Sequence, residues 1–150
     1  MPVSELGHVV LYVRNLERSA RFYRDVLGFP ALETPPHLRG AVMAFSSGRT
    51  HHELLLIAVG EDAPGPGRGR RAGLYHIGLK VGETDEELRA AAMSLSAAGV
   101  PVGGMSDHTV THSLYLADPD GNEIELYIDV PGADWTDAEQ VMAPVRPLRL

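Results

Sequence analysis

The chain has 150 residues, which suits a single domain that is long enough to bury a sizeable core. Its formal net charge of -7, from 13 basic and 20 acidic residues, argues against nucleic acid or an anionic membrane surface as a partner. Cysteine is absent, so disulfides, thiolate metal sites and cysteine nucleophiles are excluded, and any metal must be held by His, Asp or Glu.

The chain also lacks the sequence signals of membrane insertion and secretion. No apolar run approaches the ~20 residues that a membrane helix needs, and the start MPVSELGHVV has no basic region before an apolar core. We therefore expect a cytoplasmic protein. Seven histidines are a mild excess for this length, and their placement is more informative than their number.

The first half of the chain alternates between strand and helix signals. Residues 7–13 are apolar and β-branched without proline, which predicts a strand. Asn15 is a good N-cap for a helix over residues 16–27, and Gly28 can end that helix in a left-handed conformation. Further strands are expected at residues 30–34, 41–46 and 51–59.

A linker rich in Gly, Pro and Arg, residues 61–72, divides the chain into halves of similar length. Directly after it, residues 75–81 (YHIGLKV) resemble residues 7–13 (GHVVLYV) and carry a histidine at the same second position. The halves therefore look like two copies of one supersecondary unit that share a core.

The second half follows the same order of elements as the first. Thr84 and Glu87 form a capping-box pattern that opens a helix over residues 85–98, which Gly99 ends. In the tail, Thr136 and Glu139 repeat the capping pattern and predict a short helix, whereas residues 145–148 are expected to be irregular. The strands of this half are expected at residues 101–105, 111–117 and 123–130.

Residues 107–127, DHTVTHSLYLADPDGNEIELY, predict two strands joined by the tight turn Asp-Pro-Asp-Gly-Asn. Alternation in the second strand places Glu125 on the face opposite its apolar neighbours. A carboxylate within a strand costs free energy unless it has a partner, and His8 and His76 can each be offered by an earlier strand. Two His and one carboxylate on three strands suit a non-haem Fe(II) site, although Mn, Zn and Ni accept such ligands as well. We therefore predict a metal site formed by His8, His76 and Glu125.

The sequence resembles the vicinal oxygen chelate superfamily, which includes glyoxalase I, type I extradiol dioxygenases, and fosfomycin and bleomycin resistance proteins. The resemblance is carried by GHVVLYVRNLERSARFYRDVLGF, HHELLLIAV, YHIGLKV and DHTVTHSLYLADPDGNEIELY, which cover nearly the whole chain apart from linker and tail. It implies an α+β fold in which paired βαβββ modules form a curved mixed sheet or half-barrel around a metal site, with the helices outside. Residues 1–150 would then be one domain, with modules at about 5–60 and 73–130, the linker at 61–72 and a tail helix within 131–150.

Within this superfamily the pattern is most similar to the extradiol ring-cleaving dioxygenases, which use Fe(II) and O2 to open catechol-type rings in aromatic catabolism. Their metal ligands would fall on His8, His76 and Glu125. Their run of His, Leu-Tyr, Asp-Pro-x-Gly and Glu matches residues 108–125, so His108 and Tyr115 would hydrogen-bond the oxygens of the substrate. Their His-His pair matches residues 51–52, which makes His52 the expected acid–base residue. Homodimerisation is implied by the resemblance alone.

Three alternatives stay open at this stage. A glyoxalase-type isomerase would need a fourth ligand near Leu54, but the only carboxylate there, Glu53, is one residue out of phase and is expected on the other face. A fosfomycin-type thiol transferase keeps a similar triad, whereas a metal-free antibiotic-binding resistance protein usually lacks one.

The Arg-rich segment 68–71 could clamp an anionic group or be a solvated part of the linker. We expect His112, on the face opposite Tyr115, to be structural.

Overall fold

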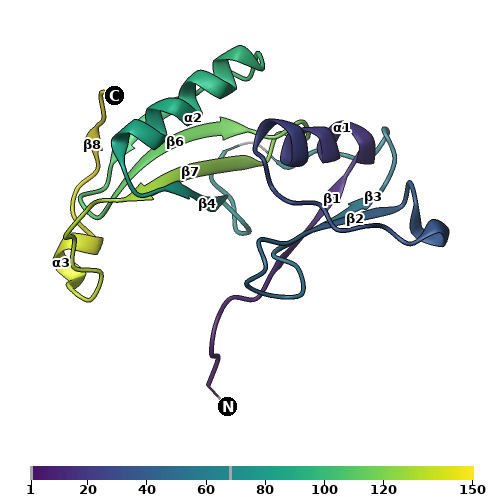
Figure 1. Cartoon of the computed structure of the whole chain (residues 1–150), viewed down its shortest axis with the longest axis horizontal. Coiled ribbons are helices and arrows are strands. Elements are labelled where there is room, and N and C mark those ends of the chain that lie inside the picture. The colour runs from purple at the N-terminus through teal and green to yellow at the C-terminus, as the bar shows by residue number, and fades with distance from the viewer. Residues whose placement is uncertain (1, 68) are drawn as a thin grey trace. The chain divides into compact units, whose positions relative to one another are not determined.

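The computed structural model describes residues 2–67 and 69–150 (Figure 1). The chain divides into two compact units, Met1–Pro66 (unit 1) and Gly67–Leu150 (unit 2). Arg68, one residue of the Arg-rich segment, lies outside the described residues. Each unit contains a first strand, a helix and then further strands, in the order that the sequence predicts.

Unit 1 is a three-stranded mixed sheet with a helix on one face. In the sheet order β1-β3-β2, β1 pairs with β3 in parallel and β2 pairs with β3 antiparallel. Short turns of 3-10 helix and π-helix complete the unit at Pro36–Leu38 and Phe22–Val26. The regular elements are β1 (Val9–Val13), α1 (Leu16–Arg21), β2 (Val42–Phe45) and β3 (Leu54–Ala58).

The helix of unit 1 begins where the sequence predicts and changes form before it ends. The Asn15 side chain accepts a hydrogen bond of 2.9 Å from the Arg18 amide, as expected of an N-cap. The predicted single helix is α1 followed by the π-helical turn, in which the Leu27 amide donates to the Phe22 carbonyl at 3.0 Å. Gly28 then adopts a positive φ of 71°, which ends the helix.

Two expected strands of unit 1 are shorter than the sequence suggested. The segment at residues 30–34 forms a single β-bridge, from Ala31 to Phe45. Pro30 has no amide hydrogen, and the Pro35-Pro36 bend follows closely, so a longer ladder does not form. The strand expected at residues 51–59 begins only at Leu54, so the two adjacent histidines precede β3 instead of lying within it.

Unit 2 is a five-stranded mixed sheet in the order β4-β7-β6-β5-β8. β4 pairs with β7 in parallel, and the other neighbours pair antiparallel. The strands are β4 (His76–Gly82), β5 (Gly104–Asp107), β6 (Thr111–Ala117), β7 (Glu123–Asp129) and β8 (Arg146–Pro147), and the helices are α2 (Asp85–Ala97) and α3 (Ala138–Val141).

Alternation along β7 separates the core of unit 2 from its polar face. Ile124, Leu126 and Ile128 are buried, and α2 packs along the sheet formed by β4, β6 and β7, as Figure 1 shows. Glu123, Glu125 and Tyr127 occupy the alternate positions and are only partly buried. The side chains of β7 that carry candidate chemistry therefore face away from the apolar core.

The caps and turns of unit 2 follow the sequence signals. Thr84 accepts from the Glu87 amide at 3.3 Å, as the capping pattern predicts, and the Glu87 carboxylate accepts from the amide of Glu83, one residue before the N-cap, at 2.7 Å. In the turn between β6 and β7, the buried Asp118 accepts from the amides of Asp120 and Asn122 at 2.9 and 2.8 Å. These bonds fix the register of the two strands that the turn joins.

The tail is more ordered than the sequence suggested. The predicted short helix is present as α3, with Asp137 as its N-cap instead of Thr136. The expectation of irregular structure at residues 145–148 is wrong for Arg146–Pro147, because these residues form β8, which pairs with β5. An ion pair of 3.1 Å between Arg146 and Asp107 holds β8 in place, and Pro147 is tolerated because β8 is an edge strand.

The predicted fold class, mixed sheets with helices on their faces, is confirmed. Each unit has an open mixed sheet and few helices, and the parts of the chain that the structure describes contain no closed barrel. Among the same residues, no helix combines the length and the apolar character that a membrane crossing requires.

We expect Leu126→Ala to lower the free energy of unfolding by about 2–5 kcal/mol, because it opens a cavity beneath α2. Leu126 is 2% exposed, whereas Leu74, just before β4, is 65% exposed. The matched control Leu74→Ala should change the same quantity by less than about 0.5 kcal/mol. Urea unfolding of both variants measures the difference, and equal destabilisation would contradict the assignment of Leu126 to the core.

Candidate functional site

Strand pairing gathers polar side chains on one face of the unit 2 sheet. The register places His76 opposite Glu123 and Gly78 opposite Glu125 in the β4–β7 pair. In the β6–β7 pair, Tyr115 lies opposite Glu125. Since paired residues share a face, these side chains meet on the side that α2 does not cover. We call this group the sheet cluster, and it comprises His76, His108, Tyr115, Glu123 and Glu125.

His76 lies between two carboxylates in the sheet cluster. Its Nε2 is 3.1 Å from Glu125 Oε2, and its Nδ1 is 3.5 Å from Glu123 Oε1. The Glu125 side chain is 14% exposed, so its carboxylate depends on these neighbours for compensation of its charge. Gly78 keeps the adjacent space open, because a Cβ there would stand 3.6 Å from Glu125 Oε2.

A hydrogen-bonded chain continues from Glu125 to His108. The Tyr115 hydroxyl donates to Glu125 Oε1 at 2.9 Å, and His108 Nε2 lies 2.8 Å from the same hydroxyl oxygen. Because the hydroxyl has one proton and gives it to Glu125, His108 Nε2 must be the donor in the second bond. The imidazole and the carboxylate are thus linked through one phenol.

Burial raises the pKa of Tyr115 well above its usual range, and the hydrogen bond to Glu125 and the charge of that carboxylate add to the effect. The pKa of Tyr127, two residues beyond Glu125 on β7, is raised as well, again mainly by burial. Both phenols therefore stay protonated at neutral pH, and Tyr115 can serve as a hydrogen-bond donor.

The loop that carries His108 adopts an unusual backbone conformation. Thr109 has a φ of 72°, and the other described residues with left-handed φ are glycines. Its amide donates to Asp107 Oδ1 at 2.7 Å, and this bond is the main reason that the pKa of Asp107 is lowered. A β-branched residue in this region costs on the order of 1–3 kcal/mol, so the surrounding contacts must hold the loop that presents His108.

A second group of titratable side chains lies in unit 1. His8, His51 and His52, here called the histidine triplet, each offer a ring nitrogen within 4.8 Å of the other two. Their ring centroids are 4.2 to 5.3 Å apart. Burial, followed by the charges of the other two rings, lowers the pKa of His52. His52 is therefore a neutral imidazole at neutral pH.

The predicted site residues thus fall into two groups. His76, Glu125, Tyr115 and His108 are brought together in unit 2. His8 and His52 are brought together in unit 1, with ring centroids 4.6 Å apart. His112 is outside both groups, and its Nδ1 contacts Asp85 Oδ1 at 2.6 Å, which ties β6 to the first turn of α2.

Comparison with known proteins identifies the family of the chain. Residues 5–126 match the model of the Glyoxalase/Bleomycin resistance protein/Dioxygenase superfamily. The chain belongs to this superfamily.

Relatives within the superfamily have different activities. The chain is 35% identical over 132 residues to catechol-2,3-dioxygenase of Bacillus subtilis. The matched segment covers 88% of this chain and 44% of that protein. It is also 35% identical over 102 residues to the mitochondrial methylmalonyl-CoA epimerase of Mus musculus, covering 63% of this chain and 54% of that protein. The chain thus spans about half the length of these curated relatives. Among solved structures, a glyoxalase/dioxygenase from Nostoc punctiforme matches with a TM-score of 0.71 at 21% identity, over 84% of this chain and 91% of that one.

One residue bears on the isomerase alternative within the superfamily. Glu53 directly precedes β3, and both of its carboxylate oxygens are engaged, by the amides of Ser47 at 2.7 Å and Thr50 at 2.9 Å. The first of these bonds is the main reason that the pKa of Glu53 is lowered. Glu53 therefore closes a loop within unit 1.

Two members of these groups were not predicted as site residues, namely Glu123 and His51. For Glu123 a signal was present, because alternation along residues 123–127 places it on the same face as Glu125. The contact of His51 with His8 was not predicted, because residues 51–59 were expected to form one strand. Adjacent strand residues point to opposite faces, whereas residues 51–53 precede β3 and let both imidazoles approach His8.

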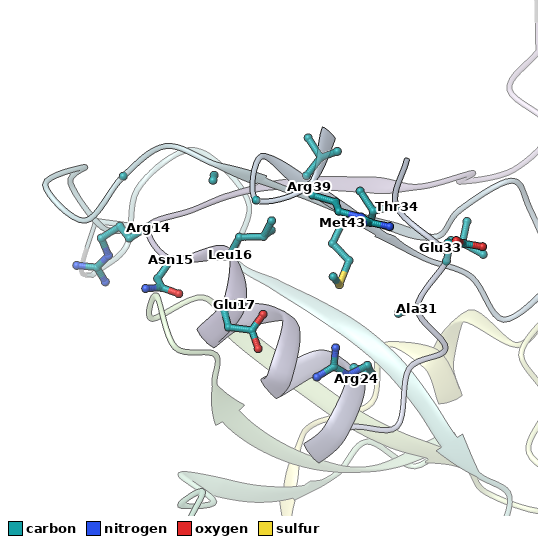
Figure 2. Close-up of a pocket in the computed structure, with 15 residues that line it drawn as sticks. Arg14, Asn15, Leu16, Glu17, Arg24, Ala31, Glu33, Thr34, Arg39 and Met43 are labelled. Atoms are coloured by element: carbon teal, nitrogen blue, oxygen red, sulfur yellow. The ribbon is translucent and has the colours of Figure 1, made fainter. Parts of the chain in front are cut away.

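A pocket with a volume of about 700 Å³ lies elsewhere in unit 1 (Figure 2). It is bounded by residues of α1, by the segment before β2 and by Met43 of β2. Its charged lining is mixed, with Glu17 and Glu33 beside three arginines, and Arg24 already pairs with Asp25 at 2.6 Å. None of the predicted site residues lines this pocket, so its size does not make it the candidate site.

Tyr115 makes the pH dependence of stability testable. Because its folded-state pKa is raised, the unfolded chain loses this proton first as the pH rises. Its contribution to the free energy of unfolding is therefore fully present below about pH 10 and declines above it. Tyr115→Phe should flatten this decline, as measured by urea unfolding at pH 8 and pH 11. Tyr12→Phe, on the exposed side of β1, is the control and should leave the slope unchanged.

Proposed function

We propose that this protein is an Fe(II)-dependent extradiol dioxygenase that cleaves a catechol-type diol with O2. The observation that carries the proposal is the distance of 3.1 Å between His76 Nε2 and Glu125 Oε2, on two strands paired in parallel. The similarity to catechol-2,3-dioxygenase supports the same activity. Members of this superfamily are mostly enzymes, which agrees with a catalytic role.

The sheet cluster has the donors that an Fe(II) ion requires. Two ligands bound at roughly 2.0–2.2 Å at a right angle to one another are about 3 Å apart, which is close to the observed separation. Glu123 Oε1 faces the other nitrogen of His76 at 3.5 Å without a hydrogen bond in this structure, and we propose that it accepts from that nitrogen and orients the ring when His76 binds the ion. Both donors also lie on rigid strands, which keeps their geometry constant.

His8 is proposed as the third ligand on the basis of the sequence. It stands directly before β1, as His76 stands at the start of β4, so the two histidines occupy equivalent positions in the two repeats. The side chain is exposed and can adopt several rotamers. Mn, Zn and Ni accept such a ligand set as well, so the identity of the ion is part of the proposal.

Each remaining residue has a chemical role that follows from its surroundings. The bound Fe(II) would supply the electron-transfer chemistry that lets O2 react with the diol. His52, with a lowered pKa, can take a proton from a diol hydroxyl and later return one to the product. His108 Nε2–H and the Tyr115 hydroxyl can donate to substrate oxygens, although Tyr115 must first exchange its bond to Glu125.

The size of the chain bears on how the substrate is enclosed. The chain spans 44% of the length of catechol-2,3-dioxygenase, so a substrate pocket formed by one copy would be less enclosed than a pocket formed by the longer protein. We propose that the protein acts as a homodimer in the cytoplasm, where a second copy can complete the enclosure. No nucleic acid or membrane partner is part of the proposal.

An epimerase is the second candidate, because the methylmalonyl-CoA epimerase is equally identical over a shorter stretch. An epimerase inverts a stereocentre by proton transfer and consumes no O2, so the two functions have different products. A fosfomycin-type thiol transferase keeps a similar triad, and a separate assay with its own substrate tests that alternative.

The deciding experiment is oxygen uptake. Protein reconstituted anaerobically with Fe(II) should consume O2 with at least one member of a catechol panel and yield a coloured ring-opened product. Inversion of an acyl-CoA stereocentre without O2 consumption would favour the epimerase. Absence of Fe(II) binding would refute the dioxygenase proposal.

His76→Ala and Glu125→Ala should each abolish stoichiometric Fe(II) binding, because each removes one of the paired donors in the sheet cluster. His37→Ala removes an exposed histidine of the 3-10 turn and should leave Fe(II) binding unchanged. Metal content after gel filtration, together with circular dichroism to check folding, measures the effect. Full Fe(II) occupancy in folded Glu125→Ala would contradict the assignment.

His52→Ala should retain Fe(II) but slow turnover about 10²–10⁴-fold, because it removes the acid–base group and leaves the proposed ligands in place. The loss should appear mainly in kcat, and the pH profile of kcat should lose the limb that His52 causes. Glu53→Ala is the matched variant for the isomerase alternative. Loss of metal in Glu53→Ala but not in His52→Ala would favour that alternative.

A further inference from the structure

The histidine triplet has the composition of a metal site by itself. Three imidazoles from two neighbouring segments of unit 1 converge with their donor nitrogens within 4.8 Å of one another. The Nε2 atom of His52 is buried without a hydrogen-bond partner among the described residues. An unpartnered buried nitrogen is unfavourable unless something binds it, and a cation bound by its neighbours would do so.

The other ring atoms of the triplet are compatible with this use. His51 Nδ1 lies 3.2 Å from the Thr50 hydroxyl, which leaves His51 Nε2 available. His8 and His51 are exposed, so their rings can rotate towards a common point. Tetrahedral coordination at roughly 2.0–2.1 Å places nitrogens about 3.4 Å apart, a distance that small χ rotations of these two side chains can reach.

The donor set selects the kind of ion. Glu53 is the nearest carboxylate in sequence, and the amides of Ser47 and Thr50 engage both of its oxygens. The triplet therefore offers three nitrogens and no carboxylate. Neutral imidazoles suit Zn²⁺ and Cu²⁺, which bind nitrogen sites more tightly than Fe²⁺ or Mn²⁺ does.

We propose that His8, His51 and His52 form a second transition-metal site, contained in unit 1, that binds Zn²⁺. Its ligand set differs from that of the proposed Fe(II) site, because His51 belongs to it and His76 and Glu125 do not. Its fourth position is open to water.

Where the proposed dioxygenase function holds, this second site has a regulatory consequence. His8 and His52 would be occupied by Zn²⁺, so a proposed Fe(II) ligand and the proposed acid–base residue would be withdrawn together. Zn²⁺ would then inhibit turnover in competition with Fe(II) loading, and His51→Ala would relieve that inhibition.

The test isolates the triplet from the sheet cluster. In the full chain, the double variant His76→Asn, Glu125→Gln removes the proposed Fe(II) ligands of unit 2 with residues of similar size. Isothermal titration with Zn²⁺ should still show one site per chain. Adding His51→Ala should weaken that binding by more than about tenfold, since loss of a direct ligand costs at least as much as loss of an outer-shell partner. Adding His37→Ala, the matched exposed histidine, should not weaken it.

Absence of Zn²⁺ binding in the folded double variant, or equal binding with and without His51, would overturn the proposal. If the double variant does not fold, imidazole NMR of the unmodified protein decides instead. Stoichiometric Zn²⁺ should then shift the ring signals of His51, and unchanged His51 signals would overturn the proposal. Failure of Fe(II) turnover bears only on the dioxygenase proposal, because neither readout here depends on activity.

Discussion

The parallel pairing of β4 with β7 is the constraint on which the sheet cluster depends. It sets Gly78 opposite Glu125. His76, two residues earlier on β4, therefore lies on the same face of the sheet. A slip of one residue would turn the carboxylate into the apolar core beneath α2. The buried Ile124, Leu126 and Ile128 on the alternate positions of β7 oppose such a slip, so hydrophobic burial on one face holds the polar chemistry on the other.

The absence of cysteine concentrates all metal-binding capacity in imidazoles and carboxylates. The chain places these in two different settings. Glu125 and Glu123 surround His76 with negative charge in unit 2, whereas the triplet of unit 1 is composed of nitrogen donors alone. A harder ion is favoured by the first setting and a softer one by the second, since ligand type governs which metal is retained.

Local signals in the sequence were sufficient for much of the fold. The Thr84–Glu87 box, the turn at Asp118 and the alternation of β7 all depend on residues close in sequence, and each is present in the structure. What could not be predicted depends on side-chain direction or distant pairing. The donation from Tyr115 to Glu125 and the approach of His51 to His8 need the rotamers of residues on separate segments. The pairing of β8 with β5 joins segments about forty residues apart, and no short pattern encodes it.

That last pairing has a consequence for how the protein behaves in a crowded solution. Without β8, the outer edge of β5 would present free amides and carbonyls, which can recruit a strand from another molecule. With β8 in place the edge strand contains Pro147, which has no amide hydrogen to offer an incoming strand. β8 thus prevents strands of other molecules from adding to the edge of β5. A chain shortened before Arg146 would lose that protection.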